Sequence, residues 1–327
     1  MSSTVRMLDG ETVEALLDLD ALIDALAPAM AELSAGVASM PARIAAHVPA
    51  EDGVLMVMPA YLPGARTLAT KMVSVFPRNA AGTPSHHAVV VVFDPDTGAP
   101  TAILDGARLT AARTAAGSAL ATRLLARDDA HVLAVLGTGT QARAHAEAMT
   151  RVRPVEEVRV AGRSPARSQA LADELSHRLG VPVTAARSYA EALDGADIVC
   201  AATHSPDPVV RRKWLFPGVH VNSVGIGGTE VDADTVADAL VVVESRASAL
   251  APYPAGARDL IAPLDAGRIT GVHAEIGELV AGTAAGRTSD QQITLYKSVG
   301  VAVQDAAAAA LVLAAAERLD AGTLLRL

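Results

Sequence analysis

The chain has 327 residues, of which 51% are hydrophobic, 19% are charged and only 2% are aromatic, and its formal net charge is −9. This balance excludes a disordered chain, and it argues against nucleic-acid binding, which needs a basic face and aromatic rings. The single cysteine, Cys200, excludes a disulfide framework and a cysteine-rich metal site. The longest apolar stretch, Ala306 to Ala316, is too short for a membrane span of about 20 residues. We therefore expect a cytoplasmic protein of roughly two domains with no membrane contact.

The first third of the chain predicts an antiparallel or mixed sheet with a helix on it. Apolar residues recur at helical spacing between about residues 13 and 33. The spacer Asp94-Pro95-Asp96-Thr97-Gly98 separates two β-rich runs and is typical of a hairpin. The expected strands of this part are 55–58, 68–76, 88–93 and 100–104.

The pattern changes after a helical run at about 112–126. From His131 onward short apolar runs alternate with helices, which indicates a parallel sheet in a doubly wound domain. An alanine-rich helix at about 299–319, with Gly322 just beyond its end, is expected to pack back on the first domain. The expected strands are 132–136, 158–161, 183–185, 198–202, 220–224 and 240–244, with helices at 141–149 and 165–179.

A glycine turn follows the strand at 132–136 directly and opens the next helix. It reads Gly137-Thr138-Gly139-Thr140-Gln141-Ala142. Gly137 allows the tight turn, Gly139 lets a pyrophosphate approach the backbone, and Ala142 permits close packing of helix on strand. The helix N-terminus offers free N–H groups to an anion. An ordinary glycine turn is the alternative, but the strand before and the helix after favour a dinucleotide site.

The end of the second strand of this domain discriminates between the two nicotinamide cofactors. An NAD site has Asp or Glu there to hold the ribose hydroxyls, whereas this chain has Arg163, Ser164 and Arg167. These side chains suit charge-assisted hydrogen bonds to a 2′-phosphate. The alternative is that both arginines are solvated at a helix start. We expect NADP(H), with NAD(H) as the second choice.

Three cations of the first domain lie in apolar or small-residue surroundings. Lys71 interrupts a strand-like run, where an unpaired lysine is costly and a desolvated lysine is a tunable acid or base. Together with Arg43 and Arg113 it suits a pocket for a carboxylate substrate. Each cation taken alone has a simpler explanation as a surface charge or an ion-pair partner. His86 and His87 have no partner at metal-ligand spacing, so no metal is expected.

Several ordered segments resemble the ornithine cyclodeaminase and mu-crystallin family over nearly the whole chain. They include Lys71-Met72-Val73-Ser74-Val75-Phe76-Pro77, Gly82-Thr83-Pro84-Ser85-His86, Leu109-Thr110-Ala111-Ala112-Arg113-Thr114-Ala115, the glycine turn, and Lys297-Ser298-Val299-Gly300-Val301-Ala302-Val303-Gln304-Asp305. The resemblance implies a homodimer of α/β subunits. A Rossmann NAD(P)-binding domain (116–299) would be inserted in an α+β substrate-binding and dimerisation domain (1–115 plus 300–327).

The same resemblance implies roles for individual residues. Arg43, Lys71 and Arg113 match positions that bind the substrate carboxylate, and Lys71 is expected to assist proton transfer. Ser85 matches a position near the nicotinamide. The further expected cofactor contacts are Thr203, Val224, Lys297, Ser298 and Gly300.

One departure from the family pattern bears on the reaction. In cyclodeaminase-like members an aspartate after the strand at 220–224 does acid–base work, whereas Gly227 holds that position here, in a shortened loop. A glycine has no side chain that acts as a base. Deamination would then depend on whether Glu230 or Asp232 takes over that role. Ketimine-reductase-like members also lack that aspartate.

These observations predict an NAD(P)H-dependent reductase of cyclic ketimine carboxylates, such as Δ1-pyrroline-2-carboxylate or its six-membered homologue. The carboxylate grip of Arg43 and Arg113 would orient the imine for hydride transfer. Three alternatives stay open: a cyclising ornithine or lysine ammonia-lyase, an amino-acid dehydrogenase, and a non-enzymatic NADPH- and ligand-binding protein like mu-crystallin.

Overall fold

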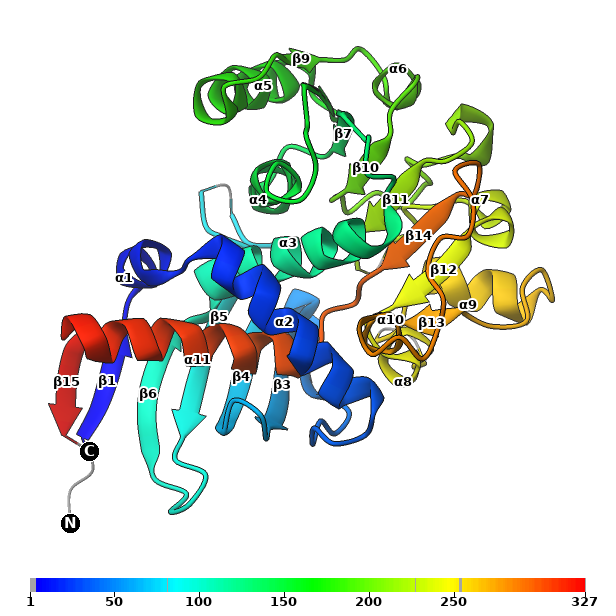
Figure 1. The fold of residues 1–327 in the computed structure, drawn as a ribbon. Helices are drawn as coiled ribbons and strands as arrows, with labels where there is room; N and C mark the ends of the chain where they lie inside the picture. The colour runs from blue at the N-terminus through cyan, green and yellow to red at the C-terminus, as the bar shows by residue number, and fades with distance from the viewer. Residues whose placement is uncertain (1–3, 81, 227, 253–254, 327) are drawn as a thin grey trace. The chain divides into compact units, whose positions relative to one another are not determined.

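The computed structural model describes residues 4–80, 82–226, 228–252 and 255–326, and the chain divides into two compact units (Figure 1). Unit 1 comprises the chain up to Arg113 together with the segment from Val301 onward, and unit 2 comprises Thr114–Gly300. The long helix α3 (Gly106–Leu125) begins in unit 1 and ends in unit 2. Among the described residues, no helix is both long enough and apolar enough to cross a bilayer.

Unit 1 is built on a mixed sheet with the strand order β15-β1-β6-β5-β4-β3-β2. Neighbouring strands are antiparallel except β1 and β6, which are parallel. The predicted hairpin is present as the antiparallel pair β5 and β6. The strands are β1 (Thr4–Leu8), β2 (Ile44–Val48), β3 (Gly53–Leu62), β4 (Thr67–Val75), β5 (His86–Phe93), β6 (Pro100–Asp105) and β15 (Thr323–Arg326).

The single helix predicted at 13–33 is wrong, because the structure has two helices there, α1 (Gly10–Leu16) and α2 (Leu19–Ser34). Asp18 has an extended backbone and its carboxylate accepts a hydrogen bond from Ala21 N at 3.1 Å. An aspartate in this position is an N-cap, which starts a second helix and interrupts the first. The short 3-10 turn Pro49–Glu51 lies between β2 and β3.

The C-terminal helix α11 (Ala302–Leu319) packs on one face of the unit 1 sheet, as predicted (Figure 1, red). It contacts β3, β4 and β5 and also α2. Ala306, Ala308 and Ala309 are completely buried at 0% exposure, because their small side chains allow the helix axis to approach the strands closely.

The strand residues that alternate with this covered face point away from α11. Val57, Met72 and Val89 pair across β3, β4 and β5 in one row, and Val89 is 39% exposed. Leu55 of β3 is 42% exposed and Ile44 of the edge strand β2 is 68% exposed. Apolar side chains therefore lie on a sheet face that no helix of unit 1 covers among its described residues.

Unit 2 is built on a parallel sheet with the strand order β13-β12-β14-β11-β10-β7-β8-β9. The order reverses between β7 and β10, which is the switch point of a doubly wound sheet. The strands are β7 (Val132–Leu136), β8 (Glu157–Ala161), β9 (Val183–Ala185), β10 (Ile198–Ala201), β11 (His220–Ser223), β12 (Leu240–Val243), β13 (Ala274–Glu275) and β14 (Thr294–Lys297). The α/β fold class with a Rossmann-type unit is confirmed.

Helices connect the strands of this sheet. They are α4 (Thr140–Met149), α5 (Pro165–Leu179), α6 (Tyr189–Leu193), α7 (Ala233–Asp238), α8 (Arg246–Ala249), α9 (Arg258–Asp265) and α10 (Ile276–Val280), with a 3-10 turn at Arg212–Trp214. Adjacent strand residues such as Leu133 and Ala134 point to opposite faces, and both have 0% exposure, so the sheet is covered on both faces.

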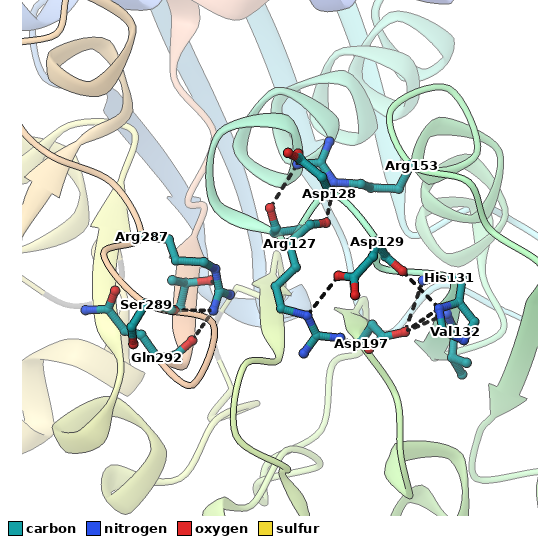
Figure 2. A network of polar contacts seen from close by, with 12 residues as sticks. Arg127, Asp128, Asp129, His131, Val132, Arg153, Asp197, Arg287, Ser289 and Gln292 are labelled. Atoms are coloured by element: carbon teal, nitrogen blue, oxygen red, sulfur yellow. Dashed lines mark hydrogen bonds and ion pairs between the residues drawn. The ribbon is translucent and has the colours of Figure 1, made fainter.

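A polar network at the amino ends of β7 and β10 ties α3 to this sheet (Figure 2). Arg153 donates to the carbonyl oxygens of Arg123, Ala126 and Arg127 at the end of α3, at 3.1, 2.9 and 2.7 Å. Arg123 is in the last turn of α3, and Ala126 and Arg127 follow it directly, so the guanidinium binds the carbonyls at the end of the helix, where N–H partners are missing. Asp197 accepts from Val132 N at 3.0 Å and from Arg127 Nη2 at 2.6 Å, which fixes the start of β7.

Candidate active site

The cationic cluster of unit 1 is centred on Lys71, which β4 directs toward α11. Alternate residues of this strand, Thr67, Ala69 and Lys71, are buried on the face that the helix covers. Lys71 Nζ lies 3.0 Å from Asp305 Oδ1 and 2.8 Å from Asp305 Oδ2. Its ammonium group also lies 3.4 Å from the hydroxyl of Thr110. The lysine is only 3% exposed, so its charge is balanced inside the protein.

Arg113 shares the same counter-ion. Its Nε donates to Asp305 Oδ1 at 3.0 Å, and its Nη1 donates to Gln304 Oε1 at 3.1 Å. Arg113 is 4% exposed and Asp305 is 1% exposed. One carboxylate on the first turn of α11 therefore bridges a cation of β4 and a cation of α3, and it compensates charges that are costly to bury alone.

The surroundings of Lys71 lower its pKa, so that the side chain loses its proton at mildly alkaline pH. Burial lowers the pKa of Lys71 to about 8, and the charges of Arg113 and, more weakly, Arg43 act in the same direction, while contact with Asp305 opposes the shift. Burial alone would raise the pKa of Asp305, but Arg113 and Lys71 hold it below its usual value. At neutral pH the cluster therefore contains two buried cations and one carboxylate.

The structure brings Lys71 and Arg113 to one counter-ion and places Arg43 within electrostatic range of the lysine. Arg43 is partly buried and lies directly before β2. Sequence reasoning assigned no role to Asp305 or Gln304. A signal for Asp305 exists nonetheless, because a buried lysine needs a counter-charge and Asp305 is an acid at the start of an otherwise apolar helix.

Ser85 lies in unit 1 directly before β5 and is partly buried. Its hydroxyl lies 2.9 Å from His86 Nδ1. No group of three or more metal-ligating side chains gathers within the ranges that the structure describes.

The glycine turn of unit 2 has the geometry that a pyrophosphate requires. Gly137 has a φ of +120°, and a Cβ there would lie 2.4 Å from Ala202 O, so only glycine fits. At Gly139, by contrast, a Cβ would meet no atom within 4 Å, so this side of the turn is open. No side chain caps the N-terminus of α4. Its N–H groups are therefore available to an anion, and these residues fit a dinucleotide.

The other residues of the turn differ in exposure. Thr138 is partly buried and Thr140 is exposed. The side-chain oxygen Oε1 of Gln141 is buried and has no hydrogen-bond partner among the described residues.

Arg163, Ser164 and Arg167 follow β8, where the ribose of the adenosine half is expected. Both arginines are exposed, and neither forms an ion pair with any residue that the structure describes. Ser164 Oγ accepts from Arg167 N at 3.4 Å and caps α5. The acid nearest in sequence, Glu157, lies at the other end of β8 and pairs with Arg159 at 2.7 Å.

The remaining predicted cofactor residues lie after the carboxyl ends of three parallel strands. Thr203 follows β10, and Val224 follows β11 and donates its N–H to Ala201 O at 3.0 Å. Ser298 Oγ donates to Glu244 at 2.7 Å, and Gly300 N donates to the same carboxylate at 2.9 Å.

Lys297, at the end of β14, is fully engaged within unit 2. Its Nζ donates to Ser223 Oγ at 2.9 Å, to Gly225 O at 2.8 Å and to Asp259 at 3.3 Å. An ammonium group has three hydrogens, so the side chain of Lys297 has none left for another partner.

Neither Glu230 nor Asp232 is placed to act as a free base. Both oxygens of Glu230 accept hydrogen bonds from residues of unit 2. Asp232 caps α7 by accepting from Thr235 N at 2.9 Å. Gly227, where the sequence resemblance places the family's aspartate, lies outside the described residues.

A doubly wound parallel sheet with a strand–glycine turn–helix at its first strand defines a Rossmann-type nucleotide-binding protein. The chain belongs to the ornithine cyclodeaminase/mu-crystallin family, whose model matches residues 4–319.

Individual relatives are similar over nearly the whole chain. A Delta(1)-pyrroline-2-carboxylate reductase of Bacillus cereus is 36% identical over 297 residues, which cover 89% of this chain and 90% of the relative. The structure of Thermococcus litoralis Delta(1)-pyrroline-2-carboxylate reductase in complex with NADH and L-proline superposes with a TM-score of 0.93 at 36% identity, covering 98% of this chain and 99% of the other. An archaeal alanine dehydrogenase dimer with bound NAD has a TM-score of 0.91 at 30% identity, with 99% of each chain covered.

The bridging role of Asp305 generates a stability prediction. Replacing Asp305 by Asn leaves Lys71 and Arg113 buried without a counter-charge, so we expect a loss of about 3–5 kcal/mol in the free energy of unfolding, measured by urea denaturation. Asp320→Asn is the control directly after the end of the same helix, because the side chain of this aspartate is 91% exposed, and it should change stability by no more than about 0.5 kcal/mol. Equal effects of the two substitutions would contradict the bridging role.

Proposed function

We propose that the chain is a cytoplasmic NAD(P)H-dependent reductase of cyclic ketimine carboxylates, with Δ1-pyrroline-2-carboxylate as the first substrate to test. The observation that carries this proposal is the buried Lys71–Asp305–Arg113 cluster in a chain that also has a dinucleotide turn. The pyrroline-2-carboxylate reductases described above support the substrate class. In this proposal unit 1 binds the substrate and unit 2 binds NAD(P)H.

The cations of unit 1 would hold the substrate carboxylate. Nε and Nη1 of Arg113 are engaged by Asp305 and Gln304, which orients the guanidinium and leaves its Nη2 edge for a ligand. Lys71 and Arg113 carry two positive charges against the one negative charge of Asp305, and Arg43 lies within electrostatic range of Lys71. A substrate carboxylate is therefore attracted to the cluster, and its bonds fix the orientation of the ring.

Lys71 would supply the proton of the reaction. NAD(P)H supplies a hydride when bound. In the reduction of an imine, Lys71 Nζ would give a proton to the ring nitrogen as the C=N double bond becomes a single bond, so that the product is the secondary amine. Lys71 regains its proton from water. With a pKa of about 8, the lysine is mostly protonated at neutral pH and still acidic enough to act as the donor.

The geometry favours reduction over the alternatives. Ammonia release from ornithine or lysine, and amino-acid dehydrogenation, need a base that accepts a proton from an amine. Glu230 and Asp232 are committed to hydrogen bonds within unit 2. A purely ligand-binding role does not require a buried lysine whose pKa lies near 8, so Lys71 favours an enzyme.

A direct absorbance assay of NAD(P)H oxidation tests this function. We expect oxidation of NADPH or NADH on addition of Δ1-pyrroline-2-carboxylate, with kcat/KM falling as pH rises through about 8, because deprotonated Lys71 has no proton to give. Lys71→Met should lower kcat about 100-fold or more and leave cofactor binding intact. No oxidation by the wild type, or full turnover by the variant, would contradict the proposal. Ammonia release from ornithine without net cofactor oxidation would favour the lyase.

For the cofactor we propose NADP(H) as the preferred form. The exposed Arg163 and Arg167 flank the position where a 2′-phosphate would lie after β8. No acid is present between Val160 and Arg167 to bind the ribose hydroxyls of NAD(H). The two solved relatives described above contain NADH and NAD, so NAD(H) is the alternative that the test must separate from NADP(H).

Arg163→Ala tests the cofactor preference. We expect it to raise the KM for NADPH about tenfold, because one charge-assisted hydrogen bond to a phosphate is lost, and to leave the KM for NADH nearly unchanged. Arg178→Ala, near the other end of α5, is the control and should alter neither value. A wild-type enzyme that uses NADH far better than NADPH would refute the assignment of Arg163.

We also propose that the chain forms a homodimer through the open face of the unit 1 sheet. Leu55, Val57, Met72 and Val89 give this face a contiguous apolar surface, which is unfavourable in water unless it is covered. The alanine dehydrogenase dimer described above supports a dimeric state, and the apolar sheet face supports the choice of interface.

A charged substitution on this face should dissociate the dimer. We expect Leu55→Glu to be a monomer in analytical ultracentrifugation, because a carboxylate would be desolvated at the interface. Leu319→Glu, which changes a leucine that is 63% exposed near the end of α11, should keep the wild-type mass. A wild-type monomer, or a dimeric Leu55→Glu, would show that the interface lies elsewhere or does not form.

A further inference from the structure

Glu230 is a buried carboxylate of unit 2 that the proposed reaction does not use. It lies between β11 and α7 and is 1% exposed. A glutamate is rarely this buried without a specific set of partners, and those partners indicate what it does.

Each oxygen of Glu230 accepts two hydrogen bonds. Oε1 accepts from Thr203 N at 2.5 Å and from Thr203 Oγ1 at 2.8 Å. Oε2 accepts from Ser223 Oγ at 2.8 Å and from Gly225 N at 2.7 Å. Thr203 follows β10, whereas Ser223 and Gly225 lie at and after the end of β11. One side chain therefore joins the segments after two adjacent parallel strands.

The backbone around this carboxylate is packed so tightly that a side chain larger than that of glycine does not fit at Gly225. A Cβ at Gly225 would lie 2.4 Å from Glu230 Cδ and 2.5 Å from Thr203 O. The segment after β10 is in turn packed against the phosphate turn, since a Cβ at Gly137 would lie 2.4 Å from Ala202 O. The segments after β7, β10 and β11 are therefore packed against one another, and Glu230 binds two of them.

The main chain of Glu230 is fixed by a second buried carboxylate, that of Asp259. Asp259 Oδ2 accepts from Glu230 N at 3.0 Å and from Val231 N at 3.2 Å. Lys297 Nζ donates both to Asp259 and to Ser223 Oγ. Lys297 is 1% exposed and Asp259 is 2% exposed, so this support is inaccessible to solvent and rigid.

We propose that Glu230 is a positioning residue for the dinucleotide: it holds the strand-end segments after β10 and β11 in the shape that binds the cofactor, and it takes no part in proton transfer. Dinucleotides bind outside the carboxyl ends of the strands at the switch point of such a sheet, which here are the ends that Glu230 joins. A segment already fixed before binding loses less conformational freedom when the cofactor arrives. The inference rests on the proposed function only in naming NAD(P)H as the ligand.

Glu230→Gln tests this role because it keeps the size of the side chain and replaces one acceptor by an NH₂ donor. That donor would face the hydroxyl or the N–H groups that Glu230 now accepts from. We expect the Kd for NADH and for NADPH, measured by fluorescence titration, to rise about tenfold. At saturating cofactor, kcat and its pH profile should stay as in the wild type. An unchanged Kd, or the loss of one limb of the pH profile, would overturn the proposal in favour of a proton-transfer role.

Asp197→Asn is the control, because Asp197 also accepts from two backbone N–H groups, at the opposite, amino ends of the strands, where it pairs with Arg127 as well (Figure 2). Its Oδ2 accepts from His131 N and from Val132 N, both at 3.0 Å. We expect Asp197→Asn to lower Tm about as much as Glu230→Gln and to leave both Kd values unchanged. Equal rises in Kd for the two variants would show that Glu230 acts only through global stability, and would overturn the proposal.

Ser223→Ala decides the question if Glu230→Gln does not fold. It removes one of the four donors and only one oxygen atom, and we expect a rise of a few-fold in the Kd for NADH. An unchanged Kd would refute the proposal. Because these readouts are binding constants, they are independent of turnover: a wild type that binds NADH but reduces no imine would refute the proposed function and leave the test of Glu230 intact.

Discussion

The contact of the Asp305 carboxylate with Lys71 and Arg113 is the interaction on which the candidate active site depends. Two cations buried in unit 1 would otherwise each lose the free energy of hydration without compensation. With Asp305 between them, β4, α3 and α11 meet at one point. The compensation is incomplete, since two cations share one carboxylate, and the remaining positive charge is what a carboxylate ligand would neutralise.

Asp305 and Glu230 show two different ways of burying a carboxylate. Asp305 is bound by cations, so its contacts set the charge of the cluster and oppose the effect of burial, which lowers the pKa of Lys71. Glu230 is bound by backbone N–H groups and hydroxyls, so its contacts determine where the backbone lies. The first arrangement suits a site that handles protons, and the second suits a surface that must keep its shape.

The features that could be predicted from the sequence are those that neighbouring residues specify. The glycine turn at Gly137 stands between a short apolar run and a helix, and this pattern is complete within about ten residues. The break between α1 and α2 is less evident, because the apolar spacing continues past Asp18 and only the cap geometry separates the helices. The partner of Lys71 is less evident still. Asp305 is 234 residues away, and an acid in the first turn of a helix is favoured there by the helix dipole alone.

The position of α11 in the chain has a consequence for biosynthesis. Unit 2 is one continuous stretch, Thr114–Gly300, whereas unit 1 is completed only when the segment from Val301 onward has been translated. Until Asp305 leaves the ribosome, Lys71 and Arg113 have no counter-ion, and the sheet has neither the helix that covers it nor β15, which pairs with β1. Domains fold as units during synthesis, so the nucleotide-binding unit is complete first. The earliest part of the chain to emerge is then the last to reach its native packing, and it exposes its apolar strands to chaperones for the longest time.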